Sequence, residues 1–379
     1  MEGLRQIAIS NKRLGLDTDV VSFDPPDATY LEGNAFRAFP LGRGALGYGF
    51  HPRAIGWLRR NAANYDAVVV NGLWQFHGLS AWIALRGSQT PYFVFTHGML
   101  DPWFKRTYPL KHLKKLIYWT LVERRLLRDA RAVLFTCEEE RLLARESFPF
   151  YKLREVVTGY GTSPPEDHPE DSVNVFHAAY PALRGRRLVL FIGRLHEKKG
   201  CDLLVSAFAR VCKRDPALHL VMAGPGGTPY EASLRAQAAA LGIGNRVTWI
   251  GMIAGAAKWG ALRAAEITCL PSHQENFGIT VAESLACGTP VAISNKVNIW
   301  REIEADRAGW VDEDDVEGTA HCLSQWLDCA PGEFEAMRER ARRCFDEHFR
   351  IEGASLRLLN LVHEELSARL PRGDSRRPS

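Results

Sequence analysis

Short apolar runs alternate with helical patterns through the second half of the chain, and this alternation restricts its possible folds more than any other feature. The runs lie at residues 188–192, 218–223, 247–250, 267–270 and 291–294. Between the first two runs, the segment from Asp202 to Cys212 carries apolar residues with the period of an α-helix. This pattern predicts βαβ units around a parallel sheet, so we expect a doubly wound domain here.

The N-terminal half repeats the pattern less regularly, with expected strands at 20–23, 67–70, 92–95 and 132–135. A chain of 379 residues is long enough for two domains that each bury a core. We therefore expect an α/β protein with domains at 1–165 and 186–348. A proline-rich segment, 166–185, is interpreted as the linker. A helix at about 350–368 is expected to pack back on the first domain, and residues 369–379 to form a disordered tail.

A helical pattern, residues 2–14, precedes the first expected strand. A doubly wound domain ordinarily begins with a strand and a glycine-rich turn before that helix, and this sequence has neither. Because the first strand is interior in the usual strand order, its absence predicts a gap flanked by two unpaired strand edges. Either the true start lies upstream of Met1 or another segment fills the gap.

Composition excludes several functional classes. Hydrophobic residues make up 46% and charged residues 24%, a balance that favours a folded globular protein over a disordered one. The net charge of +4 is small for this length and gives no support for a nucleic-acid partner. No run approaches the roughly 18 apolar residues of a membrane span, and no signal peptide is evident. These features predict a cytoplasmic protein.

Residues 103–131 are locally basic, with nine lysines and arginines against three acidic residues when Asp101 is counted. Aromatic residues are interleaved with them. This combination suits an anionic membrane surface, and it suits equally a solvated helix with one buried face. On the first interpretation, the protein lies peripherally on the inner face of the membrane and its acceptor is lipid-linked.

The turn from Gly193 to Gly200 follows a buried run and opens a helix. Such a turn presents backbone N–H groups and the positive end of a helix, which favour phosphate. Arg194 and Lys199 add full charges there. Ligands bind doubly wound sheets at the carboxyl ends of strands, so a binding site is favoured over a solvated basic loop.

The segment from Pro271 to Pro290 contains a loop with Glu275 and Gly278, followed by a helix that Gly288 ends. Two glutamates suggest a glycosidase, but eight helical positions span about 12 Å, whereas glycosidase carboxylates lie roughly 5 to 9.5 Å apart. Binding explains the pair better, because carboxylates accept hydrogen bonds from sugar and ribose hydroxyls. The helix N-terminus would then face a diphosphate.

Three motifs occur in order along the chain: Gly193 with Arg194, Lys199 with Gly200, and Glu275 with Glu283. Together they resemble the motif set of glycosyltransferase family 4, the glycosyl transferases group 1. The resemblance is close over about 187–311 and looser elsewhere. It implies a retaining enzyme of the GT-B fold, with two doubly wound Rossmann-like domains facing across a cleft. It also implies a UDP-, GDP- or ADP-sugar donor and no metal or cofactor.

The resemblance assigns roles to individual residues. Arg194 and Lys199 would hold the donor diphosphate, Glu283 the ribose hydroxyls and Glu275 the transferred sugar. The implied catalytic residues are His97, Glu275, Arg194 and Lys199. The implied donor-binding residues are Gly193, Arg194, Lys199, Gly224, Pro225, Glu275, Asn276, Phe277, Gly278, Ile279 and Glu283, where residues 276–279 act through their backbone.

His97 follows the expected strand 92–95 and precedes a glycine. The resemblance places it opposite the donor sugar. The segment from Asn71 to His77 ends another strand in the same way and is expected to line the acceptor side. The loop at Gly224 fails the dinucleotide fingerprint, because its third glycine would fall at Pro229. The resemblance makes this loop a turn near the nucleotide.

The expected function is transfer of a hexose to a hydroxyl of a saccharide or lipid-linked acceptor, in bacterial exopolysaccharide or lipopolysaccharide synthesis. Two alternatives stay open. One is a nucleotide-sugar 2-epimerase of the same fold, which needs no acceptor. The other is a catalytically silent nucleotide-sugar-binding subunit, which the missing first strand and glycine-rich turn favour.

Overall fold

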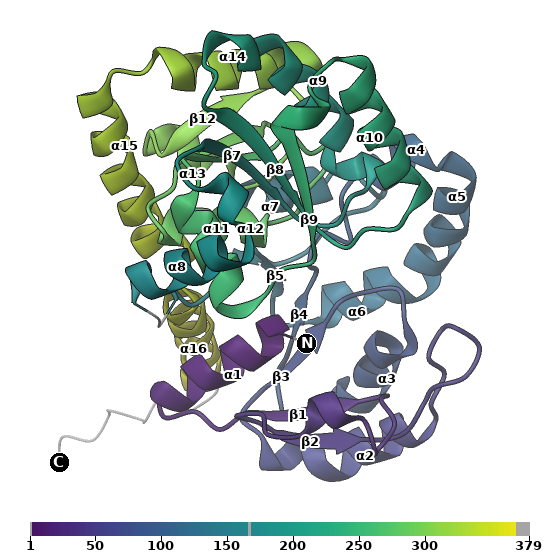
Figure 1. Cartoon of the computed structure of the whole chain (residues 1–379). Helices are drawn as coiled ribbons and strands as arrows, with labels where there is room; N and C mark the ends of the chain where they lie inside the picture. The colour runs from purple at the N-terminus through teal and green to yellow at the C-terminus, as the bar shows by residue number, and fades with distance from the viewer. Residues whose placement is uncertain (1, 166–167, 369–379) are drawn as a thin grey trace, which may run out of the picture. The chain divides into compact units, whose positions relative to one another are not determined.

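The computed structural model describes residues 2–165 and 168–368, which form two α/β units (Figure 1). The first unit contains residues up to Gly159 together with the C-terminal helix α16 (Ile351–Ser367). The second runs from Tyr160 to Arg350. The tail predicted at 369–379 lies outside the described residues.

The second unit is built on a six-stranded parallel sheet in the order β12-β11-β10-β7-β8-β9. This is the doubly wound order, in which the first strand lies beside the second and the fourth. The strands are β7 (Arg187–Ile192), β8 (Leu218–Ala223), β9 (Val247–Gly251), β10 (Ile267–Leu270), β11 (Val291–Ser294) and β12 (Gly309–Asp312). All five predicted strands are confirmed, and β12 is an additional one.

Eight α-helices are described in this unit: α8 (Pro169–Ala179), α9 (Cys201–Val211), α10 (Pro229–Ala240), α11 (Gly255–Ala264), α12 (Ile279–Ala286), α13 (Trp300–Ala305), α14 (Val316–Asp328) and α15 (Pro331–Cys344). Helix α8 occupies most of the predicted linker, which is a correction. Phe176 on α8 is fully buried. At Gly260 on α11, a Cβ would lie only 1.9 Å from the Ser172 carbonyl oxygen. This segment therefore belongs to the core of the unit, which begins at Tyr160 rather than after residue 165.

The first unit has two parallel sheets. One pairs β1 (Asp19–Ser22) with β2 (Arg37–Pro40). The other has the order β3-β4-β5-β6, formed by β3 (Val68–Asn71), β4 (Tyr92–Phe95), β5 (Val133–Phe135) and β6 (Glu155–Val157). Four of these strands coincide with the predicted ones, whereas β2 and β6 were not predicted.

The break between the two sheets falls where the sequence predicts a gap. In the described residues, β1 pairs only with β2, and β3 pairs only with β4. A side-chain contact links β1 to the segment that precedes β3, because the Tyr65 hydroxyl donates to Asp19 Oδ2 at 2.7 Å. Helix α1 (Glu2–Arg13) precedes β1, and no strand precedes it in the described residues.

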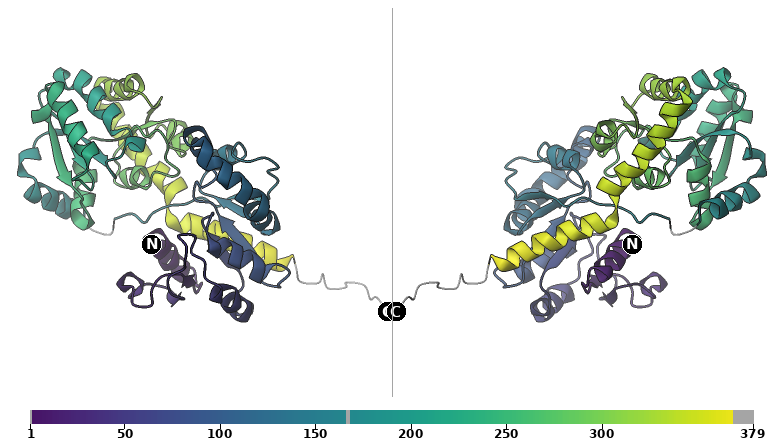
Figure 2. Two further views of the ribbon diagram at one scale, coloured as in Figure 1. Left: turned by 90° about the vertical axis from the view of Figure 1, so that its right-hand side faces the viewer. Right: turned by 90° about the vertical axis from the view of Figure 1, so that its left-hand side faces the viewer.

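Helices surround the four-stranded sheet of the first unit: α2 (Arg53–Asn61), α3 (Phe76–Leu85), α4 (Trp103–Thr107), α5 (Pro109–Tyr118), α6 (Arg124–Asp129) and α7 (Glu138–Ala144). A π-helical turn, Trp119–Glu123, separates α5 from α6. Helix α16, yellow in Figure 2, belongs to the same unit, and its Arg357 Nε donates to the Thr158 carbonyl at 2.7 Å. No helix in the described part of the chain is both long and apolar enough to span a membrane.

Candidate active site

The turn after β7 is closely packed against the loop after β10. Gly200, which caps the N-terminus of α9, has φ of +64°. A Cβ at this position would lie 2.1 Å from the Pro271 carbonyl oxygen. Only glycine satisfies both constraints without strain. His196 closes the turn on its other side, where its Nδ1 accepts the Lys198 N–H at 3.1 Å.

Lys199 and Glu275 join these two loops through an ion pair between Nζ and Oε2. Both side chains are about four-fifths buried, with 19% exposed in each. The loop after β11 holds Glu275 from the other side. The Glu275 backbone N–H donates to the Lys296 carbonyl in that loop at 3.0 Å. The structure therefore brings together two residues that the sequence predicted for one site, although they are distant in the chain.

Positive charge gathers at this point. Burial lowers the pKa of Lys199 to about 8, with smaller contributions in the same direction from the neighbouring Lys198 and Arg194. The contact with Glu275 acts in the opposite direction, because it favours the charged ammonium. Arg194 itself is exposed. The carboxyl ends of β7 and β10 form the topological switch point of this sheet, where ligands of doubly wound domains bind.

Glu283 lies on α12, whose N-cap Gly278 has φ of +72°. Its side chain is buried, and Oε1 accepts a hydrogen bond from Lys258 Nζ on α11 at 2.7 Å. The sequence did not reveal Lys258, because no spacing pattern connects it to α12. Each glutamate of the predicted pair thus has its own lysine, which fits binding better than joint acid–base chemistry.

Between these glutamates, Phe277 turns its side chain into the core. Its ring packs edge-on against Tyr160 and Phe349, with centroids 5.3 and 5.7 Å away. Phe277 can therefore offer a ligand only its backbone. Ile279, the first residue of α12, is 41% exposed, so a ligand could reach the N-terminus of this helix.

The glycine loop after β8 is organised by a side chain. Gly227 donates its N–H to Glu231 Oε2 at 2.6 Å, so a carboxylate of α10 takes a position that phosphate would have in a nucleotide cradle. A Cβ at Gly224 would lie 1.9 Å from the Gly193 carbonyl oxygen. This close approach of the two backbones explains why a glycine occupies position 224. Pro225 beside it is exposed.

In the first unit, His97 lies two residues beyond β4. It has φ of +48°, and its ring stacks on Phe95 with centroids 4.5 Å apart. Nε2 lies 3.0 Å from Asn71 Oδ1, at the end of the adjacent strand β3. Burial lowers the pKa of His97 to about 4. The imidazole is therefore neutral near pH 7.

Glu140 fixes the loop that carries His97. Its carboxylate is buried and accepts hydrogen bonds from Thr96 Oγ1 at 2.6 Å, from the Gly98 N–H at 2.5 Å and from the Thr136 N–H at 2.7 Å. The sequence did not reveal this role, because Glu140 is one of three consecutive glutamates at the start of α7.

The segment from Asn71 to His77 is held in a similar way. Trp74 has φ of +70°, and its N–H donates to Glu123 Oε1 at 2.5 Å. Glu123 is completely buried, and burial raises its pKa to about 7. The predicted acceptor-side segment thus rests on a carboxylate that the sequence analysis did not identify.

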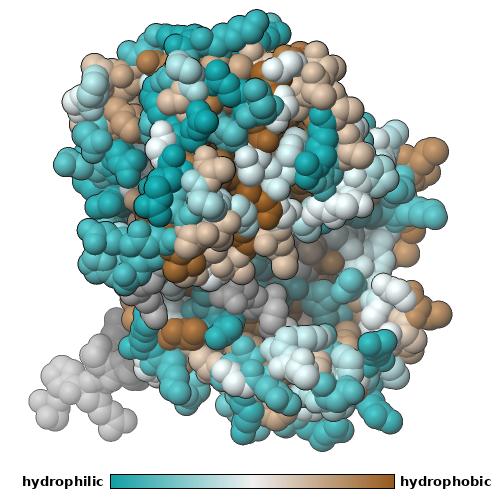
Figure 3. Space-filling view, in the orientation of Figure 1, coloured by the Kyte–Doolittle hydropathy of each residue, from teal (hydrophilic) through white to brown (hydrophobic). Residues whose placement is uncertain are grey.

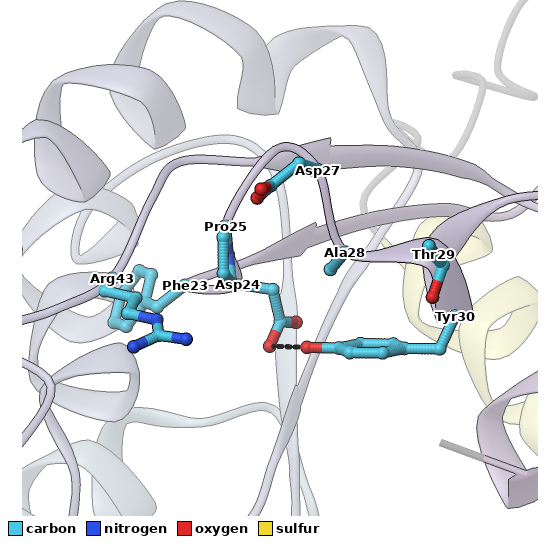
Figure 4. Close-up of a pocket in the computed structure, with 8 residues that line it drawn as sticks. All are labelled: Phe23, Asp24, Pro25, Asp27, Ala28, Thr29, Tyr30 and Arg43. Atoms are coloured by element: carbon cyan, nitrogen blue, oxygen red, sulfur yellow. Dashed lines mark hydrogen bonds between the residues drawn. The ribbon is translucent and has the colours of Figure 1, made fainter.

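A cavity of about 430 Å³ lies at the carboxyl end of β1 (Figure 4). Its lining residues are Phe23, Asp24, Pro25, Asp27, Ala28, Thr29, Tyr30 and Arg43, none of which was predicted as a site residue. The Tyr30 hydroxyl donates to Asp24 Oδ1 at 2.6 Å. Carboxylates, a hydroxyl and a guanidinium are groups that bind hydroxyl-rich ligands.

One group of possible metal ligands occurs in the second unit, where ligand atoms of Asp306, Glu347 and His348 lie within 4.8 Å of one another. His348 Nε2 lies 3.2 Å from Asp306 Oδ2, an ion pair when the imidazole is protonated. That pairing explains the cluster without a metal ion.

Two doubly wound units, with a basic turn at the switch point of the second, define the architecture of GT-B glycosyltransferases. The chain has the fold of sucrose-phosphate synthase from Thermosynechococcus elongatus, at 21% identity and a TM-score of 0.73 over 96% of this chain and 93% of that one. It also has the fold of Anabaena HepE in complex with UDP-glucose, at 18% identity and a TM-score of 0.72 over 97% and 95% of the two chains.

Family models cover both units. Residues 3–161 match the glycosyl transferase 4-like domain, and residues 174–344 match the glycosyl transferases group 1. The chain therefore belongs to the GT-B glycosyltransferases of family 4.

Among curated relatives, D-inositol 3-phosphate glycosyltransferase of Saccharomonospora viridis is 30% identical over 189 residues, which are 48% of this chain and 43% of that protein. The same enzyme of Salinispora tropica is 40% identical over 111 residues, 27% of this chain and 23% of that protein. The chain spans less than half the length of either relative.

Proposed function

We propose that the protein transfers a hexose from a nucleotide-diphosphate sugar to an acceptor hydroxyl, with retention of anomeric configuration. The observation that carries this proposal is the buried pair of Lys199 and Glu275 beside Arg194, at the switch point of the sheet. Anabaena HepE, which has the same fold, has been crystallised with UDP and with UDP-glucose.

The chemistry follows from the charges. A donor diphosphate would interact with Arg194 and Lys199 and with the helix end after them. As the bond to the sugar breaks, negative charge grows on the diphosphate, and preorganised cations stabilise it most at that stage. When the diphosphate replaces Glu275 as the ion-pair partner of Lys199, Glu275 can accept a hydrogen bond from a hydroxyl of the transferred sugar.

Glu283 would bind the ribose. Lys258 holds Oε1 at 2.7 Å, which fixes the carboxylate and leaves its second oxygen for a hydroxyl donor. The role of His97 toward the donor sugar stays a prediction. Its neutral imidazole suits a hydrogen bond to an uncharged hydroxyl.

We propose a saccharide or lipid-linked acceptor in bacterial exopolysaccharide or lipopolysaccharide synthesis, handled peripherally at the inner face of a membrane. WaaG, described as a glycosyltransferase involved in lipopolysaccharide biosynthesis, has the same fold, with a TM-score of 0.65 at 16% identity.

The test is donor turnover by the full chain with UDP-, GDP- and ADP-hexoses and a mixed acceptor pool. We expect one donor to be consumed, with the α configuration kept in the product by NMR when the donor is α-linked. Glu283→Gln should weaken donor binding at least about tenfold, because it loses a charge-assisted hydrogen bond. The control, Glu304→Gln on α13, changes an exposed glutamate and should behave like the parent.

Other outcomes identify the alternatives. An altered nucleotide sugar released without acceptor would indicate an epimerase. Nucleotide binding without consumption of any donor would indicate a silent binding subunit. Because we expect protein cations to hold the diphosphate, treatment with EDTA should leave turnover unchanged, and its loss would require a metal in the mechanism.

A further inference from the structure

Helix α5 and the turn after it expose a row of large apolar side chains. Leu110, Leu113, Ile117 and Leu121 recur every three or four residues, the spacing of one helix face. They are 83%, 57%, 59% and 57% exposed. Single exposed leucines are common on proteins, whereas a continuous apolar strip usually marks an interaction surface.

This row is not the face that packs on the unit. Leu116 and Trp119, on the opposite side, pack into the core cluster of the first unit. Lys115 lies over the rings of Phe104 and Trp74, with Nζ 4.0 and 4.7 Å from the ring centroids. Helix α5 therefore has its own buried face and a second apolar face that no described part of the first unit covers.

The apolar row is extended by Phe150. Its side chain is 74% exposed, with φ of +56°, and the Arg124 guanidinium lies over its ring at 5.3 Å. The preceding residue is anchored, because Trp119 Nε1 donates to the Pro149 carbonyl at 3.0 Å. Figure 3 shows apolar side chains, coloured brown, at the right-hand edge over α4 and α5.

The surroundings of the row are basic. Lys111, Lys114, Arg125 and Arg128 are all exposed. From Pro102 to Arg128 the sequence has one acidic residue, Glu123, and it is completely buried. Arg128 pairs with Asp129, the next residue in the chain, whereas no ion pair is described for Lys111, Lys114 or Arg125. Exposed leucines framed by lysine and arginine are typical of helices that lie in the interface of an anionic bilayer.

We propose that Leu110, Leu113, Ile117, Leu121 and Phe150 form a docking face that inserts into the surface of an anionic lipid bilayer. The surrounding cations would contact lipid headgroups while the leucines enter the acyl boundary. The charge pattern favours lipid, because the exposed cations around the apolar row complement anionic headgroups while the leucines match the acyl boundary beneath them.

The docking face is close in the fold to the predicted acceptor side. Helix α4 follows the loop that carries His97, and Lys115 of α5 contacts Trp74 beyond β3. If the proposed transfer function holds, a lipid-linked acceptor would thus be presented near the carboxyl ends of these strands. The docking face itself does not depend on that function.

The test is co-sedimentation of the full chain with two kinds of vesicle, phosphatidylcholine alone and equal parts of phosphatidylcholine and phosphatidylglycerol. We expect binding to the anionic vesicles only, weakening as salt is raised. Lys111→Glu with Lys114→Glu should reduce the partition coefficient at least about 25-fold, from roughly fivefold for each of the two lysines removed. The matched control, Arg59→Glu with Arg60→Glu on α2, makes the same change in net charge on an exposed surface of another helix.

The apolar row is tested by Leu113→Gln with Ile117→Gln, which keeps a helix-forming residue at both positions. We expect at least a tenfold loss of vesicle binding. Leu142→Gln with Leu356→Gln, exposed leucines of α7 and α16, should bind like the parent. Circular dichroism of every variant would separate a loss of binding from a loss of folding.

Three results would overturn the proposal: no binding of the parent to anionic vesicles, equal losses in the test and control variants, or a parent dimer that the Leu113 and Ile117 changes dissociate. The last would make a second copy of the chain the occupant. Turnover of a water-soluble acceptor should be the same in parent and docking variants, so failure of the transferase assay and failure of docking are distinguishable.

Discussion

Burial around the candidate site residues shifts ionisable side chains toward their neutral forms. It lowers the pKa of His97 to about 4 and of Lys199 to about 8, and it raises the pKa of Glu123 to about 7. The common cause is loss of hydration around the charged form. Lys199 still carries its charge at neutral pH, as a diphosphate ligand requires, while His97 is uncharged.

We predict that the His97 imidazole titrates near pH 4. Its pKa lies below the ordinary value of 6.5, so protonation favours the unfolded chain. The stabilising contribution is complete above about pH 6.5 and decreases as the pH falls toward 4. Nitrogen-15 NMR of the imidazole, with His97→Asn to assign the signal, would measure the midpoint. A midpoint at 6 or above would contradict the burial argument.

Glu123 gives a prediction of opposite sign. Its pKa is raised from 4.5 to about 7, so an unfolded chain releases this proton first and stability falls as the pH rises from about 4.5 through 7. Glu123→Gln removes the ionisation. It should raise the free energy of unfolding by about 1 to 3 kcal/mol at pH 8, with little effect at pH 4.5. Urea denaturation at both pH values measures this, with the exposed Glu32→Gln as control.

The sequence predicted the charged groups on strand ends but not the groups that hold them. Lys199 and Glu275 could be predicted because each lies just beyond an apolar run. Glu140 and Glu123 could not, because the site residues that they hold, Gly98 and Trp74, are 42 and 49 residues away. A buried glutamate and an exposed glutamate are the same residue type in a sequence, and only the folded structure distinguishes them.

At the scale of elements, apolar runs predicted nine strands because each run is bounded by polar or turn residues. Three strands were missed. Of these, β6 and β12 are only half-buried throughout, and β2 includes an exposed residue, so their apolar signal is weak. Helix α8 was missed for a related reason, since Ser172 and Phe176 alone are buried on it.

Tight turns between elements allow a direct test. Gly200→Ala should destabilise the second unit by at least about 2 kcal/mol, because positive φ and contact with the Pro271 carbonyl act together. Gly332→Ala, in helix α15 where a Cβ meets nothing within 4 Å, should stabilise by about 0.5 to 1 kcal/mol. Thermal or urea unfolding measures both. Equal effects of the two substitutions would mean that the turn accommodates a side chain.

At the scale of the whole molecule, the chain passes between its two units twice, after Gly159 and after Arg350. The first and last residues of the second unit are joined within that unit. The Thr162 N–H donates to the Phe349 carbonyl at 3.0 Å. Helix α16, by contrast, belongs to the first unit although it ends the described chain. Its buried residues include Ile351, Ala354 and Leu361.

This connectivity predicts unequal effects of a C-terminal truncation. A chain that ends at Arg350 keeps the whole six-stranded sheet of the second unit and the core cluster of that unit. The same chain lacks α16, whose apolar face is buried in the first unit. Exposing that face should lower the first unit's stability by several kcal/mol, on the order of 1.5 to 3 kcal/mol for each large buried side chain. We expect calorimetry to show the first unit's transition shifted down or lost, while the second unit's transition and any UDP binding by titration remain. If both transitions disappear together, the two units fold as one cooperative body and the donor-binding unit depends on the rest of the chain.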